Sequence, residues 1–286
     1  MDAAVIQPRL TAGLALRRHW PEYFIEGGAL GLFMVSAGLV TLLVQSAAFP
    51  LRALIASAGL RRLLIGLAMG TTAIGLIRSR WGKRSGAHMN PAVTLTFYCL
   101  GKVAPWDAVF YVVSQFLGGA LGVLLVWSVA GSSFAAPGVN YVVTMPGAEG
   151  VGLAFIAELG ISALLMLAVL FFSNHPRLSV YTAPCVGALL AAFIAIEAPL
   201  SGMSMNPART FASAFVARQW RHLWVYFIAP PLGMLLAAAS YRLVWRRRAI
   251  ACAKLLHPLT VRCIHCGFDP AAISVSQPRS IPEPQS

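Results

Sequence analysis

Two similar ten-residue segments carry the polar residues that stand out most in this chain. Residues 85–94 read SGAHMNPAVT and residues 201–210 read SGMSMNPART, and the two are identical at seven of ten positions. Each segment interrupts apolar sequence with Gly and Asn-Pro. Within lipid, non-helical backbone is tolerated only where protein buries it or where it lines a water-filled cavity. The repeated break therefore predicts a binding site or pore near the middle of a bilayer, rather than two unrelated surface turns.

The two Asn-Pro pairs predict the starts of two short helices. Proline is favoured at the first position of a helix, so we expect helices over about residues 91–100 and 207–217. In an inverted repeat their N-termini face each other. Each terminus is equivalent to about half a positive charge, so together they oppose any cation, including hydronium. The amides of Asn90 and Asn206 can donate hydrogen bonds into the same space, which then suits a neutral, hydrogen-bonding solute.

Arg209 adds a permanent charge to the second segment, at the position where the first segment has Val93. It follows Asn206 by three residues and so shares its helical face about one turn further on. An arginine near the centre of a bilayer costs about 2.5–3.5 kcal/mol on insertion scales. This cost predicts a specific role in a narrow hydrated constriction, rather than an arginine at a helix end that extends toward the lipid headgroups.

Other ionisable residues also lie within or beside apolar sequence. Glu26 and Glu158 come early in the first and fourth apolar stretches, and Glu197 comes at the end of the fifth. We interpret Glu26 and Glu158 as acceptors for amides of the broken segments, in preference to a proton relay. His88 is expected to line the path or to orient the loop, rather than to carry protons during transport.

The composition is that of a membrane protein. Apolar residues make up 58% of the chain and charged residues 11%. Six stretches approach the roughly 20 apolar residues that a spanning helix needs. They are Phe24–Val44, Leu63–Ile77, Val109–Val129, Leu153–Phe172, Leu178–Ala198 and Leu223–Trp245. One broken segment follows the second stretch of each set of three, which inverts the second half relative to the first. The predicted fold is therefore an all-α membrane protein, with six transmembrane helices plus two half-helices in an inverted repeat.

The net charge of +13 is explained by membrane topology. With both termini cytoplasmic, 16 of the 22 Lys and Arg residues fall on the cytoplasmic side, as the positive-inside rule requires. Basic residues do not alternate with aromatics on a soluble domain, so nucleic acid is not an expected partner. The first 21 residues lack a separate apolar core with a cleavage site, and no removable signal is expected. We predict a multi-pass protein of the cell membrane, inner or plasma.

The chain divides into three parts. Residues 1–21 are predicted to be a cytoplasmic N-terminal segment, and residues 22–246 a membrane domain with repeats over about 22–130 and 150–246. Residues 247–286 form a tail that is first basic and then rich in Pro and Ser, and we expect it to be disordered.

The tail contains several residues that are able to bind metal, one Cys-x-x-Cys among them. They are Cys252, His257, Cys263, His265 and Cys266. A zinc site needs four well-placed ligands, and neither a second Cys-x-x-Cys nor paired histidines follow. We therefore expect incidental cysteines and no metal, and a disulfide framework is not expected in a cytoplasmic tail.

These residues closely resemble the aquaporin family, also called the major intrinsic proteins, which includes the glycerol facilitators. The resemblance covers about residues 22–246. It includes Glu26, Glu158, Gln115, Gly118-Gly119-Ala120, Trp224-Val225-Tyr226, and two Asn-Pro-Ala boxes, made of Asn90, Pro91, Ala92, Asn206, Pro207 and Ala208, with Arg209 after the second. It implies six tilted helices plus two half-helices, and a homotetramer in the lipid bilayer with one pore in each subunit. The implied activity is passive conduction of water or small neutral solutes without protons, with no enzyme activity and no cofactor.

The resemblance also implies a selectivity constriction of four residues, of which Arg209 is one. Counting back from the second box gives Ile194 and Met203 as two others. For the fourth, strict counting from the first box gives Gly70, whereas the local sequence pattern favours Met69. Water-selective members usually carry an aromatic residue and a histidine here, and glycerol facilitators carry two aromatics. This chain has neither set, so we expect a passive channel for water and small neutral solutes such as glycerol or urea, not for water alone.

Three alternatives to this interpretation differ in what they predict. A strictly water-selective channel requires that the constriction has been assigned to the wrong residues. An ion-coupled secondary transporter also uses inverted repeats and broken helices, but its coupling-ion site would have only Glu26, Glu158 and His88 to draw on. An intramembrane hydrolase needs a nucleophile near a base, and neither Gly-x-Ser-x-Gly nor His-Glu-x-x-His occurs.

Overall fold

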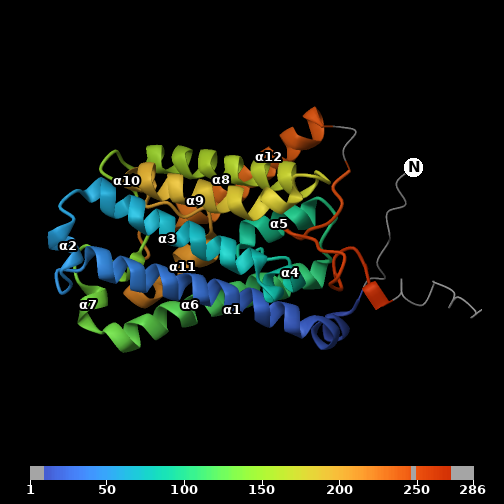
Figure 1. Cartoon of the computed structure of the whole chain (residues 1–286), viewed down its shortest axis with the longest axis horizontal. Helices are drawn as coiled ribbons and strands as arrows, with labels where there is room; N and C mark the ends of the chain where they lie inside the picture. The colour runs from blue at the N-terminus through green and yellow to red at the C-terminus, as the bar shows by residue number, and fades with distance from the viewer. Residues whose placement is uncertain (1–9, 246–248, 272–286) are drawn as a thin grey trace, which may run out of the picture.

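Six long helices dominate the computed structural model, which describes residues 10–245 and 249–271. All six are long and apolar enough to cross a membrane, and the fifth span consists of a short 3-10 helix, η2, followed by α9. In Figure 1 the long helices lie roughly parallel to one another. Their bounds are α1 Ala12–Gln45, α3 Ala58–Arg78, α6 Pro105–Ala130, α8 Val151–Ser173, η2 Ser179–Tyr181, α9 Thr182–Ile196 and α12 Leu223–Val244. The described part of the chain contains no strand, and the predicted fold class is confirmed.

Two half-helices complete the bundle, and each begins at the proline of an Asn-Pro-Ala box. They are α5 (Pro91–Cys99) and α11 (Pro207–Ala217). In the first half of the chain α1 packs along α6, and in the second half α8 packs along α12. Each half-helix also crosses over to the other half, since α5 contacts α12 and α11 contacts α6. The two halves thus hold each other's half-helix.

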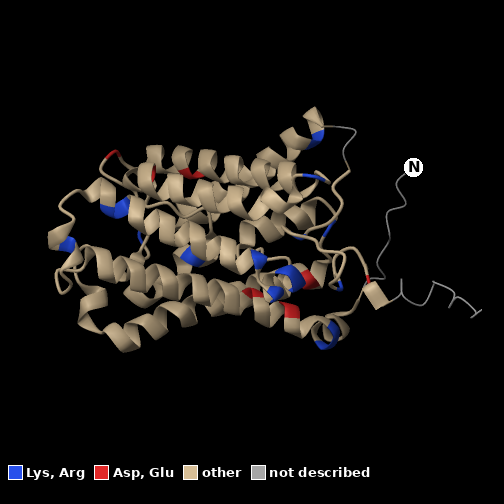
Figure 2. Cartoon of the chain, in the orientation of Figure 1, with Lys and Arg blue, Asp and Glu red and all other residues tan. Residues whose placement is uncertain are grey.

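The two ends of the bundle are covered by different elements. The start of α1 and residues 249–271 lie at one end, at the right of Figure 1, which we call the terminal end. The opposite end, called the far end, carries short helices joined by loops (Figure 1). These are α2 (Leu51–Leu54), α7 (Ser132–Ala135) and α10 (Ala198–Ser201). Figure 2 shows many of the Lys and Arg residues near the terminal end, whereas most of the length of the long helices is uncharged.

The first helix begins well before the predicted start at Phe24. Its first turns are too polar to be predicted as part of a membrane span, but polar contacts stabilise them. His19 and Tyr23 are buried, and both contact the carboxylate of Asp107 on α6, at 2.8 and 2.6 Å. α1 therefore starts at Ala12, inside the segment 1–21 that was predicted to precede the membrane domain.

Close helix crossings depend on glycine at a few positions. A Cβ on Gly118 of α6 would lie 2.0 Å from the carbonyl oxygen of Gly27 on α1. A Cβ on Gly70 of α3 would lie 2.3 Å from the carbonyl oxygen of Gly187 on α9. Both distances are shorter than any van der Waals contact, so these two helix pairs approach backbone to backbone, as small residues allow in lipid.

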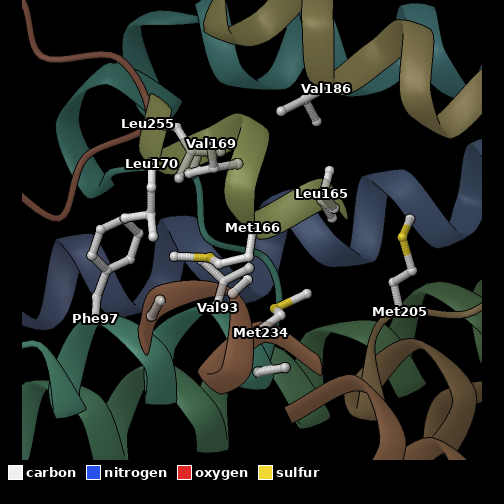
Figure 3. Close-up of a cluster of buried hydrophobic side chains, with 14 of the residues drawn as sticks. Val93, Phe97, Leu165, Met166, Val169, Leu170, Val186, Met205, Met234 and Leu255 are labelled. Atoms are coloured by element: carbon white, nitrogen blue, oxygen red, sulfur yellow. The ribbon is translucent and has the colours of Figure 1, made fainter. Parts of the chain in front are cut away.

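The apolar core holds α5 in place. In Figure 3, Val93 and Phe97 of α5 lie among side chains of α8 and α12, including Met166, Leu170 and Met234. These residues are buried almost completely. α6, in contrast, exposes a row of leucines at four-residue spacing, Leu117, Leu121 and Leu125, as expected of a face that contacts lipid.

Residues 249–271 pack against the terminal end, which corrects the expectation of a tail disordered from residue 247. This segment contains buried residues such as Leu255 and Cys263. Its backbone is held by hydrogen bonds to the bundle, from the amide of Ala251 to Asn174 Oδ1 (2.8 Å) and from the amide of Leu255 to the carbonyl of Gly86 (3.1 Å). The rest of the predicted tail, residues 272–286, lies outside the described residues, as do residues 246–248.

Candidate functional site

The two box asparagines cap their own half-helices and bind each other's loops. Asn90 Oδ1 accepts a hydrogen bond from the amide of Ala92 (2.9 Å), and Asn90 Nδ2 donates to the carbonyl of Met205 (2.7 Å). Asn206 Oδ1 accepts from the amide of Ala208 (3.0 Å), and Asn206 Nδ2 donates to the carbonyl of Met89 (2.7 Å). The start of each half-helix is thus tied to the loop before the other one. Each side-chain NH₂ group has two hydrogens, so a second donor remains beyond the one used here.

Glu26 fixes the loop before α5. Its Oε1 accepts hydrogen bonds from Ser85 Oγ (2.7 Å) and from the amide of His88 (3.1 Å). Its Oε2 accepts from the amide of Met89 (2.6 Å) and from Gln115 Nε2 (3.0 Å). Four donors therefore surround a carboxylate that is fully buried.

Glu158 fixes the loop before α11 in the same way. Its Oε1 accepts hydrogen bonds from Ser201 Oγ (2.7 Å) and from the amide of Ser204 (2.6 Å), and its Oε2 accepts from the amide of Met205 (2.7 Å). Both glutamates are hydrogen-bonded to amides of the broken segments, which is the arrangement that the sequence interpretation favoured.

The two loops also share an unusual backbone conformation. Ala87 and Met89 have φ values of 57° and 49°, and the matching residues Met203 and Met205 have 52° and 54°. Non-glycine residues are uncommon in this left-handed region and persist where the surroundings hold them. The amides of Met89 and Met205, which the glutamates bind, belong to these residues. The glutamate contacts therefore offset the strain of this backbone.

A pair of buried tyrosines, to which the sequence interpretation gave no role, holds the other side of the two loops. Tyr111 donates a hydrogen bond to the carbonyl of Ser85 (2.6 Å), and Tyr226 donates to the carbonyl of Ser201 (2.5 Å). Each tyrosine follows its serine at almost the same separation, 26 and 25 residues. Aligning the two halves of the sequence on their boxes places Tyr226 one residue before the position that matches Tyr111.

A cavity of about 340 Å³ runs between the half-helix starts. Both box asparagines and Arg209 line it, among mostly apolar side chains. α3 lines the cavity from Arg62 to Ile77. At a rise of 1.5 Å per residue, this stretch of helix is about 22 Å long, so the cavity extends along most of a membrane span.

Three predicted constriction residues line this cavity together with Arg209. They are Met69 of α3, Ile194 of α9 and Met203 of the second loop. The Arg209 Nη1 atom donates a hydrogen bond to the carbonyl of Val142 (2.9 Å), which fixes the position of the guanidinium group. Val142 belongs to η1 (Asn140–Val142), a short 3-10 helix.

Gly70, the other candidate for the fourth position, does not line the cavity. It lies at the contact between α3 and α9, where a Cβ would collide with the carbonyl of Gly187. Successive residues of a helix point about 100° apart, so a helix that turns Met69 toward the cavity turns Gly70 toward its neighbour. Of the two candidates, Met69 therefore faces the cavity and Gly70 faces α9.

His88 lies at the terminal end of the cavity, where residues 249–271 contact the loop before α5. Its Nδ1 lies 3.1 Å from Thr94 Oγ1, and its Nε2 lies 2.8 Å from the carbonyl oxygen of Ala253. His265 stacks on His88 with ring centroids 5.7 Å apart. Burial, together with the neighbouring His88, lowers the pKa of His265 to about 3, so this imidazole is neutral. The side chain of Leu255 lines the cavity beside His88.

The structure brings together four of the five residues in the C-terminal segment that are able to bind metal. Cys252, His257, Cys263 and Cys266 converge, with one ligand atom from each lying within 4.8 Å of the others. The fifth candidate, His265, stays apart from this group and contacts His88. Sequence spacing alone did not favour the group, because only two of its members form a Cys-x-x-Cys.

Comparisons with known proteins agree with this geometry. A family model described as "Major intrinsic protein" matches residues 28–241. Probable aquaporin NIP7-1 of Arabidopsis thaliana is 33% identical over 163 residues, which cover 56% of this chain and 57% of that protein. Aquaporin-4 of Mus musculus is 31% identical over 64% of this chain and 56% of its own length. The chain thus spans little more than half the length of these two relatives.

Two further matches extend over nearly the whole length of the protein compared. Aquaporin Z of Photorhabdus laumondii is 26% identical over 77% of this chain and 96% of its own length. The X-ray structure of the aquaglyceroporin from Plasmodium falciparum aligns with a TM-score of 0.64, covering 78% of this chain and 95% of that one. At 19% identity this last likeness shows a common fold. The family model covers both broken loops and reaches into the first and last long helices. The chain is therefore an integral, multi-pass membrane protein that belongs to the major intrinsic protein family.

Proposed function

We propose that this protein is a passive membrane channel for water and small neutral solutes. The observation that carries the proposal is the cavity between the starts of two half-helices, lined by Asn90, Asn206 and Arg209. The relatives named aquaporin and the fold shared with an aquaglyceroporin support the same class. We further propose that a homotetramer is the assembled form, and that both termini are cytoplasmic in the cell membrane.

The electrostatics of the cavity support exclusion of cations. The N-termini of α5 and α11 each act as about half a positive charge, and both are directed at the asparagine pair. Arg209 adds a full positive charge to the cavity wall. A neutral solute avoids this repulsion and can exchange its hydrogen bonds with water for bonds to the asparagine amides and loop carbonyls.

The lining near Arg209 supports a channel that passes more than water. Met69, Ile194 and Met203 are flexible or aliphatic and carry no strong hydrogen-bond donor. We propose that these residues and Arg209 form the selectivity constriction. A wall with one cation and three apolar side chains suits a small solute with both polar and apolar surface, such as glycerol, and also urea.

An ion-coupled transporter is less well supported, because its coupling-ion site would need a carboxylate that is free to bind an ion. Glu26 and Glu158 already accept four and three hydrogen bonds, from the loops and their flanking serines and, for Glu26, also from Gln115 of α6. Releasing one of these carboxylates would leave buried amides without partners, at about 1–3 kcal/mol each.

Stopped-flow light scattering of proteoliposomes tests the proposal. We expect shrinkage in an impermeant sugar to be faster than in protein-free liposomes, and liposomes in glycerol or urea to shrink and then reswell. Shrinkage in sugar without reswelling would identify a strictly water-selective channel. Solute uptake that saturates at low concentration and stops without an ion gradient would overturn the channel proposal.

A further inference from the structure

Four side chains of the C-terminal segment are arranged like the ligands of a tetrahedral metal. The Sγ atoms of Cys252 and Cys263 are 3.4 Å apart, and His257 Nε2 lies 3.2 Å from Cys266 Sγ. All four ligand atoms lie within 4.8 Å of one another. A zinc ion with Zn–S bonds of about 2.3 Å separates its ligands by roughly 3.8 Å, so the group needs only small shifts to surround one ion.

The local backbone prepares two of these ligands. Residues 263–267 form a tight turn, in which the amide of Gly267 donates to the carbonyl of Cys263 (3.1 Å). Gly267 has a φ of 73°, which a glycine adopts without strain, and the amide of Cys263 donates to the carbonyl of Phe268 (2.8 Å). The His257 ring meets the Phe268 ring edge to face, with centroids 5.7 Å apart. These contacts orient the ligands before any metal arrives.

The chemistry of the set selects zinc. Three thiolates and one imidazole match the Cys₃His composition of structural zinc sites, whereas Mg²⁺ and Ca²⁺ prefer oxygen ligands. A disulfide between Cys252 and Cys263 would use two of the residues and would not account for the positions of the other two. One ion accounts for all four.

The residues that lie between the four ligands in the sequence contact the loop before α5. Between Cys252 and His257, the Ala253 carbonyl lies 2.8 Å from His88 Nε2, and the amide of Leu255 donates to the carbonyl of Gly86. Leu255 also lines the cavity. Lys254 Nζ donates to the carbonyls of Lys83 (2.8 Å) and Arg262 (2.9 Å).

The Cys-x-x-Cys turn makes the second set of contacts. His265 lies between its two cysteines, stacks on His88, and has its Nε2 3.1 Å from the carbonyl oxygen of Ser85. The neighbouring Ile264 packs against Tyr23 and Tyr111 of α1 and α6. A metal that joins residues 252–257 to residues 263–266 would therefore also fix the contacts that both parts make with the bundle at the terminal end of the cavity.

We propose that Cys252, His257, Cys263 and Cys266 bind one zinc ion, and that the zinc-held segment closes the terminal end of the channel over His88. The described part of the segment, residues 249–271, has only turns and a short terminal helical stretch. A stretch of this kind needs a cross-link to keep one conformation, and a metal supplies one. Loss of zinc would release Leu255 from the cavity. The closure rests on the proposed channel function, whereas the zinc site does not.

The zinc site is tested by elemental analysis of the purified full-length protein. We expect about one zinc per subunit, and loss of zinc from the double variant Cys263→Ser/Cys266→Ser. The matched control is Cys99→Ser, which changes an exposed cysteine of α5 and should keep the zinc. Protein that is expressed and purified with Zn²⁺ and contains no more zinc than the double variant would overturn the site. A Cys252–Cys263 disulfide found by non-reducing mass spectrometry would overturn it as well.

The closure is tested by stopped-flow water permeability with and without a membrane-permeant zinc chelator. We expect chelation to raise the permeability several-fold, added Zn²⁺ to reverse the rise, and the double variant to be permeable without chelator. Cys99→Ser should behave as the unaltered protein. Equal permeability with zinc bound and removed would overturn the closure. A chain that binds zinc but conducts in neither state would contradict the proposed function and the closure, and would leave the zinc site supported.

Discussion

Arg209 is the residue that most distinguishes the second half of the chain from the first, since its counterpart in the first half is Val93. Its guanidinium is fixed by the carbonyl of Val142 and lines the same cavity as Met203. A unit charge acting on a cation at 4 Å is worth about 4 kcal/mol at an effective dielectric constant of 20. Each half-helix terminus supplies about half of such a charge, so Arg209 contributes a large part of the barrier to cations that we propose.

We predict that Arg209→Val admits cations and relaxes discrimination among solutes. Even a third of the Coulomb energy corresponds to about a tenfold rise in cation flux. Sodium and proton flux into proteoliposomes, read with fluorescent indicators, measures the effect. The control Arg177→Val removes an exposed arginine and should leave fluxes unchanged. If the cation flux and solute profile of Arg209→Val match those of the unaltered protein, the constriction lies elsewhere.

At the scale of elements, the shape of the cavity depends on how closely α3 and α9 approach. The Gly70–Gly187 contact sets this distance and, at the same time, directs Met69 into the cavity. The half-helices are held from both halves of the chain, by the asparagine exchange with Met89 and Met205 and by the packing of α5 on α12. The width of the cavity is therefore a property of helix packing as much as of the residues that line it.

We predict that Gly70→Ala destabilises the protein, because its new methyl group would lie 2.3 Å from the Gly187 carbonyl. Overpacking of this kind costs about 1–3 kcal/mol. The midpoint of thermal unfolding in detergent should fall by several degrees, and solute permeability should change as α3 moves. Gly75→Ala on the same helix meets no atom within 4 Å and serves as the control. Equal midpoints for the two variants would contradict the backbone contact.

At the scale of the molecule, both the start of α1 and the C-terminal segment lie at the terminal end, where many of the basic residues gather (Figure 2). The spans among the described residues are even in number, which is consistent with the start of α1 and residues 249–271 lying on one side of the membrane. The distribution of Lys and Arg then favours the cytoplasm for that side. The thiolates of a zinc site also remain reduced there, whereas an oxidising compartment would convert cysteines to disulfides.

We predict that a fluorescent protein fused to the C-terminus is fluorescent in bacterial cells, because such reporters fold in the cytoplasm. Alkaline phosphatase, which needs oxidised disulfides, should be inactive at the same position. Fused after Ala148, an exposed residue of the loop before α8, the phosphatase should be active instead. The opposite pattern at the two positions would reverse the proposed orientation.

The sequence by itself determined the spans, the inversion and the starts of both half-helices. These features depend on local signals, namely runs of apolar residues and a proline at the first helical position. The roles of Glu26 and Glu158 as acceptors also followed from the sequence, since a buried carboxylate near broken backbone has few other partners. The start of α1 did not, because His19 and Tyr23 are stabilised by Asp107 on a distant helix.

Two features could not be predicted from the sequence, namely that Met69 rather than Gly70 lines the cavity and that the C-terminal segment reaches it. The first choice depends on the rotation of α3 about its axis, which is set by contact with α9 and not by α3 alone. The second depends on four side chains from separate positions meeting at one point, on a segment that consists mainly of turns and irregular structure. Convergence of this kind is non-local, because it arises from hydrogen bonds to the loop at Gly86 and His88 that no sequence pattern encodes.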